Sequence, residues 1–387
     1  MSSEKNFKFA LSTNLVFGLN SSEQLGSQIK NLGYFNIGII LDQGVFNHPQ
    51  SIKAFKSIEE AGISFKMHKN ESVEPTYDYL EQFRKQFTLN NYDCLVGIGG
   101  GSTLDLAKGL AILLTNEGKA LSYRGFPQLK NKPLAVVALP TTAGTGSEAT
   151  YNAVFTDSQE KKKLGINYIH NFPVCAIIDP LFTVDCPKSV TVSSGCDALV
   201  HTLESYVHKN HTSISRIYSK EAFRLLYRGL SEVLDKPKEA TIRVDLALGA
   251  YLAGIALMNS GSGPSGAFSY PLGAVYHVPH GYAGGVFIAH ITKINVEKGY
   301  KDYDQLYDLI EGVDKNISSS EKNINFAKKI QELMDKLEVP RSLSNYNLNP
   351  KDIDFMIAQY EVLKAAIDQN PIEISKDDVT KMMEGLK

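Results

Sequence analysis

The feature that most constrains the fold is an apolar run that leads into three consecutive glycines. Residues 94–98 form a strand-like run, and Gly99, Gly100 and Gly101 follow it directly. Ser102 stands where it can cap a helix predicted over 102–114. Because glycine has no Cβ, backbone N–H groups at such a turn can approach a bulky anion closely, and the helix adds its own unpaired N–H groups. The pattern is typical of a nucleotide diphosphate site, although an ordinary turn between a strand and a helix uses the same residues.

The pattern of elements changes about halfway along the chain. In the first half, strand-like and helix-like segments alternate, which predicts βαβ units and a mostly parallel sheet. Strands are predicted over 36–41, 64–68, 94–98, 135–139, 153–155 and 176–178, and helices over 50–61, 77–87 and 102–114. In the second half, long periodic stretches predict helices over 194–207, 215–234, 239–258, 303–311, 321–337 and 352–368. We therefore expect an α/β domain over 1–184 and an all-helical domain over 185–387.

Composition excludes several classes of protein. The 387 residues suffice for two domains, and a formal net charge of −2 provides no basic field for nucleic acid or an acidic membrane surface. No apolar leader follows Met1, and no run of about 20 apolar residues predicts a membrane span. The four cysteines have no CxxC spacing, which favours free thiols. We expect a cytoplasmic protein that binds neither nucleic acid nor membrane.

Two other strand ends carry polar groups suited to a nucleotide. Asp42 closes the run 36–41, where a carboxylate commonly accepts hydrogen bonds from the ribose of NAD; a loop carboxylate or a helix N-cap is the alternative. The segment 140–148 follows the run 135–139 and reads Pro-Thr-Thr-Ala-Gly-Thr-Gly-Ser-Glu. Its four hydroxyls can bind a nucleotide or a substrate oxygen, whereas a plain turn would use the same residues.

Candidate metal ligands lie in the second half. Asp197 and His201 are four residues apart in a predicted helix, so both side chains can reach one metal ion, although a surface Asp–His pair has the same spacing. The stretch 270–281 contains His277 and His280 together with prolines and glycines. It predicts a rigid loop that presents His280, a side chain suited to metal binding and proton transfer.

Together these motifs resemble the iron-containing (group III) alcohol dehydrogenases, in the superfamily that includes dehydroquinate synthase and glycerol dehydrogenase. The matching runs cover nearly the whole chain, at 99–108, 140–148, 162–166, 178–180, 195–206 and 279–281. The resemblance implies a Rossmann-like N-terminal domain, an all-helical C-terminal domain and a homodimer. It also implies reversible hydride transfer, in the cleft between the domains, between NAD or NADP and a small primary alcohol or its aldehyde.

The resemblance also implies roles for individual residues. A nicotinamide cofactor would bind to residues of the sheet domain, namely Asp42, Gly99, Gly100, Gly101, Ser102, Asp105, Thr141, Thr142, Thr145 and Lys163. Asp197, His201 and His280 fall on three of the family's four metal-ligand positions. The metal, Fe²⁺ or Zn²⁺, would act as a Lewis acid on the substrate oxygen.

Two positions depart from the family pattern. Where the family usually carries HxxxHPLG, this chain has Gly266 and Tyr270. Glycine has no side chain to bind a metal, and a tyrosine, with an ordinary pKa of about 10, is a much weaker acid than an imidazolium. Three outcomes are open. The metal site has three protein ligands; or His277 supplies the fourth; or the metal is lost, and Asp197, His201 and His280 serve as acid–base or polar groups.

Tyr270, His277 and His280 are the candidate catalytic residues. A tyrosine in place of the second histidine of the family pattern also occurs in a branch that resembles 3-deoxy-octulosonate 8-oxidase. The stretches 113–118, 123–125 and 130–133 are similar to that branch, although it keeps the ligand histidine that Gly266 replaces. The branch suggests a polar polyol, sugar-acid or phosphonate-like substrate. The alternatives to a dehydrogenase are therefore a sugar-alcohol oxidase that works without nicotinamide and a non-catalytic nucleotide-binding homologue.

Overall fold

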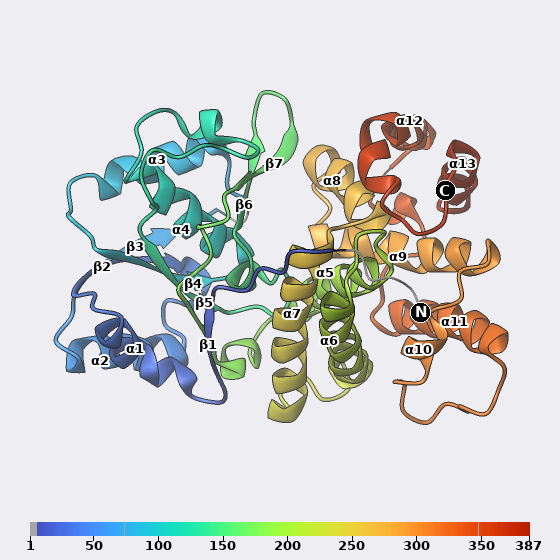
Figure 1. Cartoon of the computed structure of the whole chain (residues 1–387), viewed down its shortest axis with the longest axis horizontal. Helices are drawn as coiled ribbons and strands as arrows, with labels where there is room; N and C mark the ends of the chain where they lie inside the picture. The colour runs from blue at the N-terminus through green and yellow to red at the C-terminus, as the bar shows by residue number, and fades with distance from the viewer. Residues whose placement is uncertain (1–5, 73, 347) are drawn as a thin grey trace. The chain divides into compact units, whose positions relative to one another are not determined.

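The computed structural model describes every residue except 1–5, 73 and 347, so the expectation about a leader at the first residues lies outside its described part. The chain forms two compact units, which we describe separately (Figure 1). The sheet unit comprises Ser12–Thr191 and Lys238–Ala247. The helical unit comprises Val192–Pro237, Leu248–Lys387 and the described part of Met1–Leu11. The sequence analysis placed a single boundary after residue 184, whereas each unit is built from separate stretches of the chain.

The sheet unit is built on six parallel strands, which confirms the predicted α/β fold. Their order is β1 (Asn14–Phe17), β8 (Cys175–Ile178), β5 (Ala135–Pro140), β4 (Cys94–Gly99), β2 (Asn36–Asp42) and β3 (Ser64–Asn70). The predicted strand at 153–155 belongs instead to a separate antiparallel pair, β6 (Asn152–Asp157) and β7 (Lys162–Asn167).

Helices cover both faces of this sheet, so its central strands are apolar throughout. One face packs on α1 (Leu25–Asn31) and α2 (Pro49–Glu60), and the other on α3 (Tyr77–Phe87) and α4 (Gly101–Leu113) (Figure 1). The chain moves outward from β2 to β3 and then returns to place β4 on the other side of β2. In open α/β sheets, ligands bind outside the carboxyl ends of the strands at such a reversal. Those ends are Asp42 and Gly99.

The helical unit confirms the predicted all-helical second half. Its helices, two of which begin in segments assigned to the sheet unit, are α5 (Lys188–Val207), α6 (Ser213–Glu232), α7 (Ala240–Ser260), α8 (Pro264–Tyr276), α9 (His280–Glu297), α10 (Asp304–Tyr307), α11 (Ser319–Lys336), α12 (Pro350–Ile367) and α13 (Lys376–Gly385). Capping boxes at Thr212, Ser318, Asn349 and Ser375 satisfy the first N–H groups of α6, α11, α12 and α13.

The predicted helix over 303–311 is mostly wrong. Only α10 is helical there, because Leu309 and Ile310 donate their backbone N–H groups to carbonyls three residues earlier instead of four. Such bonds make successive turns and do not continue an α-helix.

The rigid loop predicted over 270–281 is also wrong in its extent. Helix α8 continues to Tyr276 with Pro271 inside it, and only three residues separate it from α9. His277 ends α8 in a left-handed conformation (φ 57°), where its N–H donates to the carbonyl four residues earlier at 3.2 Å. The N–H of Val278 donates to the carbonyl six residues earlier at 3.3 Å. His280 therefore stands at the start of a helix.

Helix α7 is the one helix in the described part of the chain that is long and apolar enough to cross a membrane. Most of the window that passes this test, 61%, is buried inside the protein, as in a core helix.

Candidate active site

The predicted diphosphate site lies at the start of α4. Strand β4 ends at Gly99, Gly100 is the N-cap residue, and α4 begins at Gly101. Ser102 is thus inside the first turn, and the prediction that it caps the helix is wrong. The N-cap residue, Gly100, has no side chain to cap the helix. The first N–H groups of an α-helix have no partner within it, and together with the helix dipole they favour an anion.

Close packing explains two of the three glycines. A Cβ at Gly99 would lie 2.6 Å from Thr103 Oγ1 and 2.8 Å from Asp42 Cβ. A Cβ at Gly101 would lie 2.5 Å from Thr145 Cγ2. At Gly100 the nearest atom would be 3.5 Å away, an ordinary contact. Gly99 and Gly101 therefore allow the end of β2 and the segment after β5 to approach the turn, while a Cβ at Gly100 would make only an ordinary contact with Thr142.

Asp42 is both a helix cap and a neighbour of the glycine turn. Its Oδ1 accepts a hydrogen bond of 2.7 Å from the N–H of Gly44 and caps a short 3-10 helix, Gln43–Val45. The alternative of a helix N-cap is thereby confirmed. The ribose contact stays a prediction, and the position of Asp42 beside Gly99 is compatible with it.

The threonine-rich segment after β5 lies against the same turn. The N–H of Thr141 donates to the carbonyl of Gly99 at 3.0 Å, and Thr142 faces Gly100. Thr145 packs on Gly101, and its Oγ1 accepts from the N–H of Ser147 at 3.2 Å. The structure thus brings the three predicted threonines together with the glycine turn.

Asp105 binds protein groups in this structure. Its Oδ1 accepts from the hydroxyl of Ser147 at 2.5 Å, and its Oδ2 accepts from the N–H of Val154 at 2.9 Å. Lys108, one turn further along α4, lies 3.0 Å from Asp105 Oδ1 and donates to the carbonyls of Ser147 and Asn152. These contacts join α4 to the threonine-rich segment after β5, and the contact of Asp105 with a cofactor stays a prediction.

The ion pair of Lys108 with Asp105 is largely buried, and no role was predicted for Lys108 from the sequence. Lys108 is fully buried, and burial lowers its pKa against the effect of Asp105. Burial also raises the pKa of Glu148, at the end of the threonine-rich segment, to about 7. The sequence signal for this ion pair was an acidic and a basic residue three positions apart in an otherwise apolar helix.

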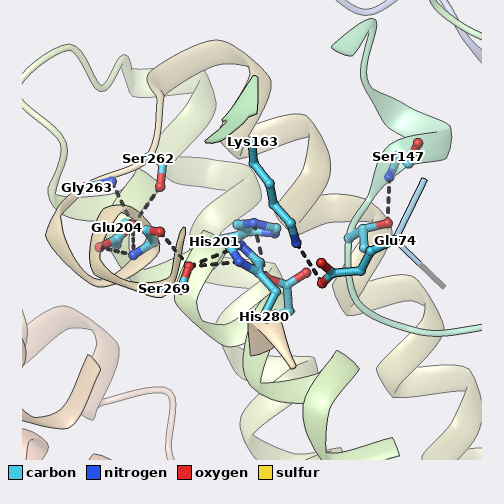
Figure 2. A network of polar contacts seen from close by, with 12 residues as sticks. Glu74, Ser147, Lys163, His201, Glu204, Ser262, Gly263, Ser269 and His280 are labelled. Carbon is cyan, nitrogen blue, oxygen red and sulfur yellow. Dashed lines mark hydrogen bonds and ion pairs between the residues drawn. The ribbon is translucent and has the colours of Figure 1, made fainter. Parts of the chain in front are cut away.

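Lys163, the last predicted cofactor residue, lies on β7. Its Nζ forms an ion pair of 2.7 Å with Glu74 Oε1 (Figure 2). Glu74 belongs to the segment that precedes α3, and neither residue of this ion pair is near the glycine turn in the sequence.

The three predicted metal ligands meet at Asp197 in the helical unit. Asp197 and His201 lie one turn apart on α5, and the carboxylate Oδ1 is 3.5 Å from His201 Nε2. The same Oδ1 is 3.8 Å from Nε2 of His280, the first residue of α9 (Figure 2). The Nδ1 atom of His201 is buried and has no hydrogen-bond partner.

Asp197, His201 and His280 have the right ligand types for a divalent cation, and their distances approach what one requires. Two ligands of a tetrahedral Zn²⁺ lie about 3.4 Å apart, given metal–ligand distances of about 2.1 Å. The two pairs around Asp197 approach this separation, and a carboxylate with two imidazoles is a suitable set of ligands for Zn²⁺ or Fe²⁺. As the side chains stand, no group of three or more His, Cys, Asp or Glu residues in the described part of the chain is arranged to hold a metal ion.

The two residues that depart from the family pattern lie on α8. A Cβ at Gly266 would lie 2.3 Å from Ser262 Oγ and 3.1 Å from Glu204 Oε2, so any side chain there requires Ser262 to move. The ring of Tyr270 packs against that of His280, with centroids 5.1 Å apart. His277 is exposed at the end of α8, and none of the described ion pairs joins it to Asp197.

A buried carboxylate that the sequence analysis overlooked fixes the start of α8. Glu204, on α5, accepts hydrogen bonds from the hydroxyl of Ser262 at 2.9 Å and from the backbone N–H groups of Gly263 at 2.7 Å, Ser265 at 2.5 Å and Gly266 at 3.3 Å (Figure 2). Burial raises its pKa, and these hydrogen bonds oppose that effect. The available signal was an acidic residue three positions after His201 in a largely apolar helix.

Comparisons with known proteins cover both units. The family model described as iron-containing alcohol dehydrogenase matches residues 12–180, and that described as Fe-containing alcohol dehydrogenase family, C-terminal, matches residues 191–386. The 1,3-propanediol dehydrogenase of Citrobacter freundii is 30% identical over 348 residues, 88% of either chain. The NAD-dependent methanol dehydrogenase of Bacillus methanolicus is 27% identical over 95% of this chain and 96% of its own length. A crystal structure of 1,3-propanediol oxidoreductase gives a TM-score of 0.93 at 26% identity, over 99% of this chain and 100% of that one.

Proposed function

The chain belongs to the iron-containing alcohol dehydrogenase family, as its motifs indicated, and we propose that it interconverts a primary alcohol and its aldehyde with NAD. The observation that carries the proposal is the glycine turn at the start of α4, placed at the reversal point of a parallel sheet. In the oxidative direction, the alcohol carbon gives a hydride to NAD⁺ and the alcohol oxygen loses a proton. The products are the aldehyde, NADH and H⁺.

The residues around the turn support NAD as the cofactor. The diphosphate would bind to the N–H groups at the start of α4, beside Gly100. Asp42 would accept from the adenosine ribose, and its negative charge would disfavour the additional phosphate of NADP. The methanol dehydrogenase relative is described as NAD-dependent, which agrees with this assignment.

The residues around Asp197 would act on the substrate oxygen. Asp197, His201 and His280 would hold a divalent cation, Fe²⁺ or Zn²⁺, which polarises that oxygen when bound. Tyr270 lies against His280 and is 36% exposed, so its phenol can donate a hydrogen bond to a substrate oxygen. The phenol proton can also be given to the product of aldehyde reduction. We propose a polar substrate, which the phenol would help to bind.

The proposal is tested by titrating purified protein with NADH and NADPH and assaying a panel of aldehydes. The panel contains unsubstituted, hydroxylated and acidic aldehydes of equal chain length, each assayed with and without added Fe²⁺ or Zn²⁺. We expect NADH oxidation that depends on aldehyde, and higher kcat/KM for the polar members. Failure to bind either nucleotide at millimolar concentration would contradict the proposal. Peroxide release from an alcohol without nicotinamide would favour the oxidase instead. A cytoplasmic location and a homodimer stay predictions from the sequence.

A further inference from the structure

We propose that Lys108 is a positioning residue that holds residues 147–154, which we call the junction segment, in the conformation that binds the cofactor. The junction segment runs from the end of the threonine-rich segment into β6. Lys108 lies on α4, about two turns after Gly101, and its side chain is fully buried. The inference rests on the proposed function, because NAD is the cofactor assigned there.

The ammonium group of Lys108 binds backbone oxygens along the junction segment. Its Nζ donates to the carbonyl of Ser147 at 3.0 Å and to the carbonyl of Asn152, and the carbonyl of Thr150 lies 3.4 Å away. Asp105 Oδ1, at 3.0 Å, supplies the opposite charge. A lysine ammonium has three N–H donors, so two carbonyls and one carboxylate can use all of them. Because a buried charge requires such partners, Lys108 is committed to these contacts.

The junction segment has little regular hydrogen bonding of its own. Residues Ser147–Ala149 form a single 3-10 turn, and β6 begins only at Asn152. The N–H of Thr150 donates to the carbonyl of Ser147 at 3.4 Å, which is a long hydrogen bond. A buried backbone carbonyl without a donor costs free energy. Lys108 therefore supplies donors that let this irregular stretch lie against α4.

Asp105 completes the attachment with the opposite polarity. Its Oδ1 accepts from the hydroxyl of Ser147 at 2.5 Å, and its Oδ2 accepts from the N–H of Val154 at 2.9 Å. Asp105 and Lys108 are neighbours on the surface of α4, three positions apart. One side chain binds acceptors of the junction segment and the other binds its donors, so the pair fixes both ends of the segment.

Two predicted cofactor residues depend on where the junction segment lies. Thr145 comes just before it, packs on Gly101 and accepts from the N–H of Ser147 at 3.2 Å. Beyond the segment, Thr156 of β6 pairs with Lys163 of β7. A segment that is fixed before binding loses less conformational entropy when the cofactor binds. Loss of Lys108 should therefore weaken NAD binding, although Lys108 itself is enclosed by protein groups.

The test compares Lys108→Met with the wild type, since methionine keeps the unbranched apolar stem and removes the donors. We expect the Kd for NADH, measured by fluorescence titration, to rise about tenfold or more, because the junction segment must then be ordered on binding. Hydrogen exchange followed by mass spectrometry should show faster exchange over residues 147–154 in the variant, with the change confined to this segment and its neighbours.

A second pair of variants separates position from charge. Lys108→Met leaves the carboxylate of Asp105 without its cation, which destabilises the chain. The double variant Lys108→Met/Asp105→Asn removes both charges and should recover part of that stability. Compared with Asp105→Asn alone, it should still bind NADH about tenfold more weakly, because the carbonyls of the junction segment lack their donor.

A matched control lies on the same helix. Leu110 is also fully buried on α4, but its side chain is apolar and belongs to the core beneath the sheet. Leu110→Ala should lower stability through a cavity and leave the Kd for NADH within about twofold. A Kd within twofold in Lys108→Met, or equal weakening in Leu110→Ala, would overturn the inference. A wild type that binds no NADH would contradict the proposed function, whereas faster exchange confined to the junction segment in Lys108→Met would still support the hold of Lys108 on it.

Discussion

The glycine turn of the sheet unit and the polar cluster of the helical unit, which we define as Asp197, His201, Glu204, Ser269 and His280, are built in opposite ways. The turn uses backbone geometry at the ends of neighbouring strands, and its side chains are mostly small. The cluster uses charged and polar side chains from α5, α8 and α9, most of them buried. A site of the first kind tolerates little added volume, whereas a site of the second kind depends on individual polar contacts.

The largest expected effect separates the two regions directly. His280→Ala removes a side chain that contacts Asp197, Ser269 and Tyr270. We expect kcat/KM for aldehyde reduction to fall by about 10³-fold, as for loss of an acid–base group, while the Kd for NADH, measured by fluorescence, stays within twofold. A variant with kcat/KM within tenfold of wild type would show that the polar cluster is not the reacting site.

The second prediction concerns Glu148, the buried carboxyl group at the end of the threonine-rich segment 140–148. Burial raises the pKa of Glu148 to about 7 from an ordinary 4.5, so the folded state holds this proton more tightly than the unfolded state. Binding of this proton therefore adds its full contribution to the free energy of unfolding below about pH 4.5, and the contribution is lost as pH rises through 7. Relative to Glu148→Gln, the wild type should therefore lose about 2–3 kcal/mol of unfolding free energy between pH 5 and pH 8. Urea denaturation at both pH values measures it, and a constant difference would contradict burial as the cause.

The third prediction sharpens the statement that the turn depends on space. Gly101→Ala places a methyl group 2.5 Å from Thr145 Cγ2, and we expect a loss of about 1–3 kcal/mol in unfolding free energy. Gly100→Ala meets nothing closer than 3.5 Å and has φ −70°, so its stability should change by less than about 0.5 kcal/mol. Both variants should bind NADH more weakly. Equal stability of the two would show that the threonine loop does not pack tightly on the turn.

The smallest expected effect tests Asp42, a charged side chain beside the turn. Asp42→Ala should raise KM for NADH about tenfold, the equivalent of about 1.4 kcal/mol, and raise KM for NADPH less or lower it. Saturating kcat should stay unchanged, because Asp42 does not touch the reacting atoms. Asp42→Asn is the paired control, since an amide oxygen can still accept from Gly44. An unchanged ratio of NADH to NADPH specificity would remove Asp42 from the cofactor site.

Much of the fold could be predicted because it follows from local pattern. Alternating apolar segments predicted the parallel sheet, and residues 99–101 predicted the turn because strand, glycines and helix are contiguous. Predictions failed where tertiary contacts override local preference. Pro271 and the glycines near it indicate a loop, but the segment is helical because Glu204, far away in sequence, satisfies the N–H groups of its first turn. Ser102 resembles a cap but lies one position inside the helix.

The family and the two kinds of domain could be read from the residues alone, because those properties depend on residue type and short-range order; the nucleotide and metal residues stay predictions. The packing of the chain was needed to show that Asp105 and Lys108 bind the threonine-rich segment after β5, that Ser262 occupies the space beside Gly266, and that Ser269 contacts both His280 and Gly266. The hydrogen bonds of these residues span up to 62 positions. Hydrogen bonds are specific within about 3 Å, and which atoms come that close depends on how the helices pack.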